Sequence, residues 1–422
     1  MTSSNFELDE ATRMSISRRV VVTGMGVVTP VGSTVADMWA SLVAGKSGVD
    51  QIRRIDASTF PTTIGAEVRD LDESRFPQDP AVRAILDRKN IFGWVAAADA
   101  LTDAGILGHR PPRFGISIGT ESRRPDFLDR LATSTVYPNT TDHLRYSPFV
   151  IAGTLAAHYG LNGPQMTVST ACTSSTQALG VAYQKVRWGQ ADAMLSGGCD
   201  SLIDPLMLTG FSLLGALSTR NDEPQRASRP FDLHRDGFVL GEGAGMLVLE
   251  ELEHARARGA HIYGEVLGYA SSSNAYRLTD SPPDGQGAYL SMKNALIDAG
   301  VRPDEIDYIN AHGTSTHQND RSETAAIKRC FGDHARTLAI SSTKSMMGHL
   351  VNGGGAVELI VCLLSMIHGI LTPTINYETP DPECDLDYVP NVARHQRVDR
   401  TLSNSFGFGG INATVVAGKY GQ

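Results

Sequence analysis

The chain has 422 residues, 41% of them hydrophobic and 20% charged, and its formal net charge is -9 at pH 7. A chain of this size can bury a large core and divide into more than one lobe, and its acidic balance argues against broad binding to nucleic acids or anionic membranes. Its five cysteines show no paired spacing and no CxxC motif, so the sequence indicates neither a disulfide framework nor a zinc site, and a reducing cytoplasm is the expected location.

The chain begins with polar residues of mixed charge. Residues 1–17 lack the apolar core of a signal peptide, so we expect a flexible N-terminal tail. The longest apolar run, residues 356–370, contains Glu358 and ends in His368 and Gly369, which favours a buried helix over a membrane span.

Strand-like and helix-like segments alternate after the tail, which predicts an α/β protein. The β-branched residues 18–28 predict a strand, residues 33–44 and 81–103 show helical patterns, and residues 114–118 predict a short strand. Residues 121–146 are polar, charged and irregular, so we interpret them as a surface excursion that can face a partner.

The second half of the chain repeats the order of elements in the first half. Three pairs of segments correspond in the same order: 100–106 with 295–301, 114–118 with 306–311, and 166–171 with 338–344. Chance similarity of short helix ends is the alternative, but we expect two related halves, 18–263 and 264–422, whose equivalent turns meet at one seam.

Cys172 lies where a predicted strand turns into a predicted helix, within residues 168–179. The first turn of a helix offers unpaired N–H groups and the positive end of the helix dipole, which favour a thiolate. Cys172 is therefore a candidate nucleophile. The alternative is a small buried cysteine packed among Ser, Thr and Ala.

Three further candidates follow predicted strands. His312 lies in Asn-Ala-His-Gly-Thr-Ser-Thr, residues 310–316, and Lys344 and His349 bound the motif Lys-Ser-Met-Met-Gly-His. Either histidine alone is more often a structural hydrogen-bonder than a catalyst. Two histidines and a lysine at strand-to-helix turns, in a chain with a cysteine at a helix start, favour a catalytic site.

A glycine-rich segment near the C-terminus places Phe408 between two glycines. Residues 404–412 read Asn-Ser-Phe-Gly-Phe-Gly-Gly-Ile-Asn and precede a predicted strand over residues 413–417. Such a run leaves backbone N–H groups able to point into a site.

These motifs resemble those of the elongating β-ketoacyl-acyl carrier protein synthases, condensing enzymes of the thiolase superfamily. The matching segments are 170–174, 310–316, 342–349 and 404–410, together with 217–222 and 229–245. The resemblance covers nearly everything from Arg18 onward. It implies a five-layered αβαβα fold of two similar halves, in agreement with the repeat.

The resemblance also implies roles for the candidate residues. Cys172 would take the acyl group from the phosphopantetheine thioester of a carrier protein. His312 and His349 would hydrogen-bond the thioester carbonyl of a malonyl extender and stabilise the enolate that forms as carbon dioxide leaves. The N–H groups of Cys172 and Phe408 would form an oxyanion hole for the attack on the acyl-cysteine.

Other residues would support this site. Lys344 would orient neighbouring groups and favour anions, with Glu358 holding it in place, although a plain structural ion pair fits both residues as well. Phe408 would act as a gate over the acyl pocket or simply as a packed aromatic. Thr314 and Thr316 would bind the pantetheine arm or merely cap a turn.

The chain departs from the usual family pattern in three places. Residues 119–126, Gly-Thr-Glu-Ser-Arg-Arg-Pro-Asp, replace a glycine-rich stretch near the acyl pocket and the subunit interface. Residues 317–320 and 86–92 also differ. These changes predict a specialised enzyme, the ketosynthase subunit of a type II polyketide synthase paired with a homologous chain-length-factor subunit. A homodimeric fatty-acid elongation synthase is the alternative.

Other functional classes fit less well. A non-catalytic partner subunit usually lacks the cysteine, a degradative thiolase would need a second cysteine near the C-terminal motif, and a cysteine hydrolase would not explain two histidines with the Gly-Phe-Gly-Gly loop. The expected enzyme needs an acyl carrier protein and a dimer partner, but no metal and no cofactor, because the thioester carries the activated acyl group.

Overall fold

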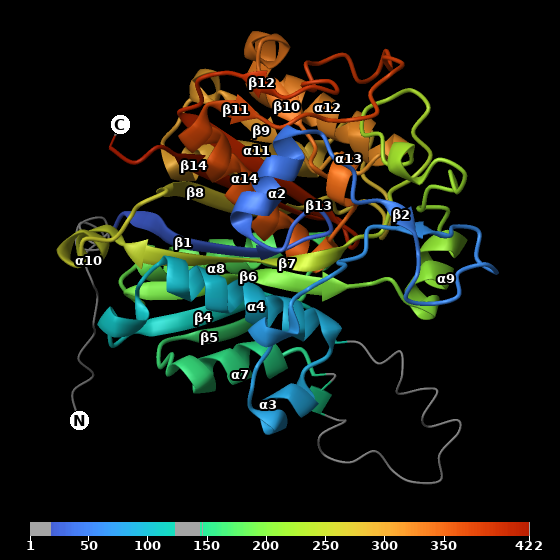
Figure 1. Ribbon diagram of the computed structural model, residues 1–422. Coiled ribbons are helices and arrows are strands. Elements are labelled where there is room, and N and C mark those ends of the chain that lie inside the picture. The colour runs from blue at the N-terminus through green and yellow to red at the C-terminus, as the bar shows by residue number, and fades with distance from the viewer. Residues whose placement is uncertain (1–17, 123–143, 146, 422) are drawn as a thin grey trace, which may run out of the picture.

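The computed structural model describes residues 18–122, 144–145 and 147–421. The predicted tail, residues 1–17, and most of the predicted excursion, 123–143 and 146, lie outside the described residues. Figure 1 shows most strands of the first half of the chain, in blue to yellow, below those of the second half, in dark yellow to red.

In the part of the chain that the structure describes, ten strands form one central sheet, in the order β10-β9-β13-β14-β8-β1-β7-β6-β4-β5. The first half contributes β1 (Val20–Val28), β4 (Phe114–Gly119), β5 (Gln165–Val168), β6 (Ala193–Ser201) and β7 (Glu242–Glu251). The second half contributes β8 (Gly264–Ser273), β9 (Tyr308–Asn310), β10 (Ala339–Ser341), β13 (Arg400–Gly407) and β14 (Ile411–Gly418).

The two halves have the same strand topology. In the first half, β4 lies parallel to β5 and β6, and β7 pairs antiparallel with β6 and β1. In the second half, β9 lies parallel to β10 and β13, and β14 pairs antiparallel with β13 and β8. Within the described residues, only a short antiparallel ladder, Val20–Val22 against Gly264–Val266, joins the two sets of five strands. The prediction of two similar halves is confirmed, whereas the exact division at residue 264 stays a prediction.

Helices cover both sides of each set of strands. The main helices are α4 (Arg88–Asp103), α7 (Val150–Tyr159), α8 (Ser174–Arg187), α11 (Gln286–Ala299), α12 (His317–Phe331) and α14 (Gly354–His368). Helices α4 and α7 pack on the outer face of the first half, α11 and α12 lie on the outer side of the second, and α8 and α14 pack together between the halves. The predicted five-layered αβαβα arrangement is therefore confirmed.

Strand β7 shows how its sequence fits this layering. Leu247 and Leu249 pack into the central core with α8 and α14, whereas Met246 and Val248 pack into the outer core with α4. Because side chains alternate along a strand, a continuous apolar run is buried on both faces.

The helix predicted over residues 81–103 is wrong as a single element. The structure has α3 (Pro80–Ile85) and α4, separated at Leu86, whose backbone is extended. The carboxylate of Asp87 accepts the N–H of Asn90 and so caps α4. An aspartate that can cap a helix competes with helix continuation, which explains the break.

Helix α2 (Val35–Val43) corresponds to the helix predicted over residues 33–44. Further short elements among the described residues are β2 (Asp50–Gln51), β3 (Ile64–Gly65), α9 (Pro205–Leu213), α10 (Leu252–Ala257), α13 (Lys344–Met347), β11 (Ile370–Leu371) and β12 (Arg394–His395). Among the described residues, the helical stretch Val351–His368 is long and apolar enough to cross a membrane, but 89% of it is buried inside the protein. It is the core helix α14 with its preceding turn, as predicted.

Candidate active site

Cys172 lies in a strained turn between β5 and α8. The 3₁₀ turn Ala171–Thr173 leads directly into the helix. Ala171 has a φ of 50°, a left-handed conformation that costs a residue other than glycine about 1 to 2 kcal/mol. The hydroxyl of Ser174 accepts the N–H of Thr170 at 2.9 Å and so holds the turn. The backbone therefore presents Cys172 at the start of α8.

His312 follows β9 and is held through its backbone. Its N–H donates to one carboxylate oxygen of Glu323 at 2.9 Å, and the N–H of Gly313 donates to the other at 2.8 Å. The side-chain amide of Asn404 also donates to Glu323, at 3.2 Å. Burial raises the pKa of Glu323 to about 7. Sequence reasoning missed Glu323, because a glutamate inside a helix normally faces solvent.

His349 follows α13 and has a defined tautomer. The backbone N–H of Val351 donates to His349 Nδ1 at 3.2 Å, so the proton of the neutral ring lies on Nε2. Within the described part of the chain, Nε2 is buried without a hydrogen-bond partner. It is therefore available as a donor to a bound substrate.

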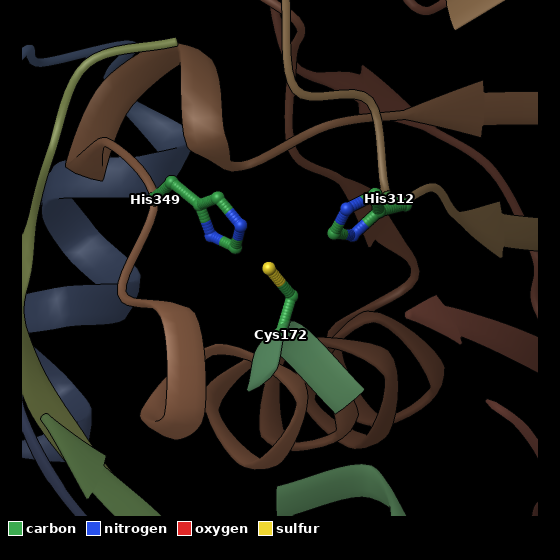
Figure 2. A group of neighbouring side chains, drawn as sticks. All are labelled: Cys172, His312 and His349. Carbon is green, nitrogen blue, oxygen red and sulfur yellow. The ribbon is translucent and has the colours of Figure 1, made fainter. Parts of the chain in front are cut away.

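Cys172, His312 and His349 come together in one place. A side-chain ligand atom of each lies within 4.8 Å of those of the other two, and the two imidazole centroids are 5.3 Å apart with the rings at 82°. Figure 2 shows the three side chains converging from three different segments. Burial and the positive charge of Lys344 hold the pKa of both histidines well below the ordinary value of 6.5, so both rings are neutral at neutral pH.

Lys344 forms a buried ion pair with Glu358 of α14. Burial raises the pKa of Glu358, while the ammonium group of Lys344 opposes that effect. The lysine acts on the three residues above through its charge, because it lowers the pKa of the Cys172 thiol and of both imidazoles.

The expectation of a thiolate at Cys172 is not supported. Burial raises the pKa of this thiol to about 12, although Lys344 and the N–H groups of Phe408 and Cys172 act in the opposite direction. The helix start offers its N–H groups, but the desolvation cost of a charged sulfur is larger. A neutral thiol beside two neutral imidazoles can lose its proton during nucleophilic attack rather than before it.

The Phe408 loop contacts the cysteine turn from the other side. A Cβ added to Gly407 would lie 3.3 Å from Cys172 N, so glycine permits this close approach. The backbone N–H groups of Phe408 and Cys172 both act on the Cys172 sulfur. The Phe408 ring stacks on Phe211, with centroids 6.1 Å apart. Two N–H groups directed at one sulfur can also bind an oxyanion formed on a carbonyl attached to it.

A cavity of about 400 Å³ contains this cluster and extends away from it. Thr314 and Thr316 line it, and their hydroxyl oxygens are 3.0 Å apart. Thr316 also caps α12 by accepting the N–H of Asn319. The rest of the lining includes apolar residues, among them Leu202, Met207, Phe211, Leu214, Phe238 and Phe408, and polar residues, among them Glu121, Asp236, Asp280, His317, Gln318 and Asn319.

The three side chains also include the donor types that zinc takes. However, Val351 fixes the proton of His349 on Nε2, the nitrogen that is left without a partner. A protonated nitrogen donates a hydrogen bond and has no lone pair for a metal. The cluster is therefore arranged to bind an oxygen acceptor.

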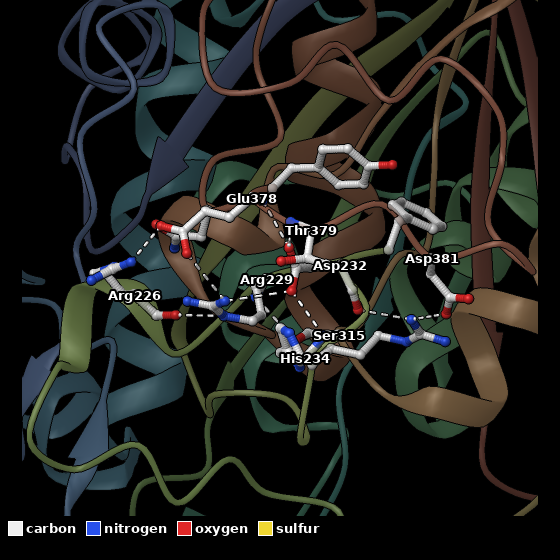
Figure 3. Close-up of polar contacts among 12 residues, drawn as sticks. Arg226, Arg229, Asp232, His234, Ser315, Glu378, Thr379 and Asp381 are labelled. Carbon is white, nitrogen blue, oxygen red and sulfur yellow. Dashed lines mark hydrogen bonds and ion pairs between the residues drawn. The ribbon is translucent and has the colours of Figure 1, made fainter.

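A buried polar network supports the loop that carries Thr314 and Thr316 (Figure 3). The backbone N–H of Arg229 donates to Ser315 Oγ at 3.0 Å, and Asp232 accepts the N–H groups of Glu378 and Thr379 at 2.7 and 2.6 Å. These residues are far apart in sequence, and no local pattern indicated their contacts.

Two family models together match most of the chain. The N-terminal domain model of beta-ketoacyl synthases matches residues 17–255, and the C-terminal domain model matches residues 263–378.

Individual relatives cover nearly the whole chain. It is 46% identical over 417 residues to the 3-oxoacyl-(acyl-carrier-protein) synthase 2 of Coxiella burnetii, covering 94% of this chain and 98% of that protein. It is 43% identical over 420 residues to a putative polyketide beta-ketoacyl synthase 1 of Streptomyces cyaneus, covering 95% and 98%.

Solved structures with the same fold include polyketide enzymes. A type II polyketide synthase ketosynthase, solved with its acyl carrier protein and bound to the hexaketide, matches with a TM-score of 0.87 and 37% identity over 96% of this chain and 99% of that one. The ishigamide ketosynthase/chain length factor matches with a TM-score of 0.88 and 36% identity over 96% and 100%.

Proposed function

The chain belongs to the beta-ketoacyl synthase family and is an acyltransferase that forms 3-oxoacyl thioesters on an acyl carrier protein, and we propose that it works as the ketosynthase subunit of a type II polyketide synthase. The observation that carries the chemistry is the convergence of Cys172, His312 and His349 within 4.8 Å. The residue roles below are part of the proposal.

The first step transfers an acyl group to Cys172. The sulfur attacks the carbonyl of the incoming thioester, a sulfur–carbon bond forms, and the pantetheine thiol leaves with the proton that the cysteine loses. The N–H groups of Cys172 and Phe408 bind the oxyanion of this tetrahedral intermediate. Thr314 and Thr316 lie along the cavity, where their hydroxyls can bind the pantetheine arm, and the Phe408 ring can shield the acyl group.

The second step extends the chain. The bond between the malonyl carboxylate and its methylene carbon breaks, carbon dioxide leaves, and the electron pair forms an enolate. Both rings are neutral, so each carries one N–H group. His349 donates from Nε2 to the enolate oxygen, and His312 donates its N–H beside it. Lys344, held by Glu358, keeps them neutral through its charge.

The enolate carbon then attacks the acyl carbonyl on Cys172. A carbon–carbon bond forms, the carbon–sulfur bond breaks, and the sulfur leaves as a thiolate that takes up a proton from water. No resident metal or redox cofactor is needed, because the thioester carries the activated acyl group.

Two departures from the family pattern support the polyketide pathway. Glu121 belongs to the unusual segment 119–126, and His317, Gln318 and Asn319 belong to the unusual segment 317–320, and all four line the cavity. A polar cavity lining suits a growing acyl group that retains oxygen atoms along its length, as a polyketide does. The second candidate is fatty-acid elongation, which the higher identity to a 3-oxoacyl synthase favours. A non-catalytic partner subunit is less well supported, because the cysteine and both histidines converge.

A dimer is supported by the difference between the two sheet edges. Ile340 of the edge strand β10 donates its N–H to Asp387 O at 2.9 Å, so the following chain covers that edge. Among the described residues, β5 at the opposite edge pairs only with β4, and its residues are half-buried or exposed. Such an edge is a site for pairing with another chain. The partner is a homologous chain-length-factor subunit or a second copy, and the acyl carrier protein delivers the substrates.

We place the enzyme in the cytoplasm, which suits its free cysteines.

Reconstitution tests the pathway. The protein is purified alone and with a co-expressed homologous subunit, each sample receives acyl- and malonyl-carrier proteins, and carbon dioxide release and product mass are measured. Multi-round products that need the second subunit support the polyketide role. Efficient single-round condensation by the protein alone would assign it to fatty-acid elongation.

A further inference from the structure

Asp236 lines the cavity and has one carboxylate oxygen without a hydrogen-bond partner. Its Oδ2 accepts the backbone N–H of Thr219 at 3.3 Å, which holds the side chain in place. Its Oδ1 is buried and, within the part of the chain that the structure describes, makes no hydrogen bond. Such a buried acceptor is costly and rare in folded proteins, which indicates a partner that is bound only during turnover. His349 Nε2, the proposed donor to the enolate, is a buried atom without a partner at the same cavity.

Both sequence neighbours of Asp236 are bonded to the loop that carries the two cavity threonines. The guanidinium group of Arg235 donates to Thr316 O at 3.2 Å. The backbone N–H of Gly237 donates to Ser315 O at 3.0 Å. Because this loop fixes the backbone before and after Asp236, the aspartate lies beside the threonines that are proposed to bind the pantetheine arm.

The same segment continues from the threonine loop to the imidazole of His349. The Phe238 ring contacts that imidazole, with the centroids 5.4 Å apart and the rings at 79°. Asp236 precedes Phe238 by two residues, a span of at most about 7 Å of chain. Both residues line the cavity. One wall of the cavity therefore carries an aromatic ring at the proposed enolate site and, a short way along the chain, an acceptor.

The pantetheine arm contains the donors that this acceptor lacks. Each amide of the arm has an N–H donor and a carbonyl acceptor, and the first amide is joined to the thioester sulfur by a single ethylene unit. Threonine hydroxyls can donate to the amide carbonyls, whereas a carboxylate only accepts and so pairs with an N–H group. A saturated acyl chain has no donor, and a carboxylate gains nothing from lying against it.

We propose that Asp236 is a further substrate-binding residue, whose Oδ1 accepts an amide N–H of the pantetheine arm and so selects thioesters that are carried on an amide-containing arm. This inference rests on the proposed function, because it concerns the thioester on which Cys172 and His349 act. A site that hydrogen-bonds an N–H group of its substrate discriminates against the analogue that lacks it, because the polar atom of the site is then left unpaired.

The test uses octanoyl-pantetheine and its depsi analogues, in which an ester oxygen replaces the N–H group of one or the other amide. Single-turnover acylation of Cys172 is followed by intact-protein mass. We expect the wild-type enzyme to load one analogue about 10-fold to 100-fold more slowly than octanoyl-pantetheine, as for a hydrogen bond to a charged group. Asp236→Ala should bring this ratio close to one, and Asp236→Asn, which keeps an oxygen acceptor, should retain part of it. The matched control Asp222→Asn changes an exposed aspartate and should leave the ratio unchanged.

A ratio near one for both analogues in the wild-type enzyme, or an unchanged ratio in Asp236→Ala, would overturn the inference. If Asp236 only held Thr219, its replacement would slow all the substrates equally and leave the ratio unchanged. Because the ratio is taken within one protein sample, a loss of folded protein does not mimic the effect.

Octanoyl-carrier protein and carbon dioxide release from malonyl-carrier protein are measured on the same samples. If all the pantetheine substrates load Cys172 equally, only this inference fails. If neither octanoyl-pantetheine nor octanoyl-carrier protein loads Cys172 and no carbon dioxide appears, the proposed function fails.

Discussion

The turn before α8 and the turn before α14 occupy the same place in the two halves. Each is a 3₁₀ turn, Ala171–Thr173 and Val351–Gly353, that leads into a central helix. Each begins with a left-handed residue that is not glycine, with φ of 50° at Ala171 and 44° at Val351. Cys172 is the second residue of one turn, and Asn352 is the second residue of the other.

The two turns differ in what precedes them. Two residues separate β5 from its turn, whereas nine, Ser342–Leu350, separate β10 from the other. The longer segment carries Lys344 and His349. In the proposed mechanism, the first half therefore supplies the nucleophile on a short connection, and the second half supplies a cation and a hydrogen-bond donor on a long one. If these proposed roles are right, mutations should separate condensation from decarboxylation.

Replacing the nucleophile should have the largest effect. We expect Cys172→Ala to lower condensation by on the order of 10³-fold or more, because no sulfur remains to hold the acyl group. Carbon dioxide release from malonyl-carrier protein should persist or rise, because His312 and His349 remain. Product mass and carbon dioxide release are measured together. The control Cys330→Ala, on α12, should leave both activities intact. Retained condensation in Cys172→Ala would end the nucleophile assignment.

Removing the hydrogen-bond donor His349 should stop both decarboxylation and condensation. In His349→Ala we expect decarboxylation to fall by about 10²-fold to 10³-fold, as for the loss of an oxyanion donor, and condensation to fall with it. The same two assays check this. His368→Ala, at the exposed C-terminal end of α14, is the matched control. Normal carbon dioxide release in His349→Ala would contradict its role at the enolate.

The site residues that lie in strand-to-helix turns could be predicted from the sequence. Cys172, His312, Lys344 and His349 lie in local motifs at strand-to-helix turns, and turn motifs are recognisable because their constraints are local. The repeat predicted two related halves because it rests on short local segments that recur in the same order. The sequence comparison aligned residues 166–171 with 338–344, which correctly matches β5 with β10. However, the structure places the counterpart of the cysteine turn further on, at Val351–Gly353. The sequence comparison missed this equivalence because nine residues, Ser342–Leu350, separate β10 from the second turn.

Other features could not be predicted because they depend on tertiary contacts. Glu323 holds His312 from a helix eleven residues further along the chain, and Asn404 joins it from a distant strand. The neutral state of the Cys172 thiol follows from burial, which no local pattern reports. The helix start alone therefore predicted a lowered pKa for this thiol, whereas desolvation raises it.

Asn352 tests whether the second turn is structural. Its side-chain amide donates to Asp200 at 2.6 Å, and its Oδ1 lies 2.6 Å from Ser174 Oγ in the other turn. We expect Asn352→Ala to lower the free energy of unfolding by about 2 to 4 kcal/mol, because Asp200 loses a buried donor. Urea unfolding measures this. The exposed Asn294→Ala on α11 should change it by less than about 0.5 kcal/mol. A similarly small change in Asn352→Ala would remove the structural link between the turns.

The pH dependence of thiol alkylation tests the ionisation state of the first turn. Since burial raises the pKa of Cys172 to about 12, the thiolate is a small fraction at neutral pH and grows about tenfold with each pH unit. We expect iodoacetamide to label Cys172 about tenfold faster per unit from pH 7 to pH 9, with labelling followed by peptide mass. A cysteine-containing control peptide should level off above a pKa of about 8.5. The sign is decisive: a thiolate stabilised by the helix start would have a pKa below that of the peptide, so its labelling rate would level off at a lower pH than that of the peptide. A plateau for Cys172 would show that the N–H groups and Lys344 outweigh burial, and that attack starts from a preformed thiolate.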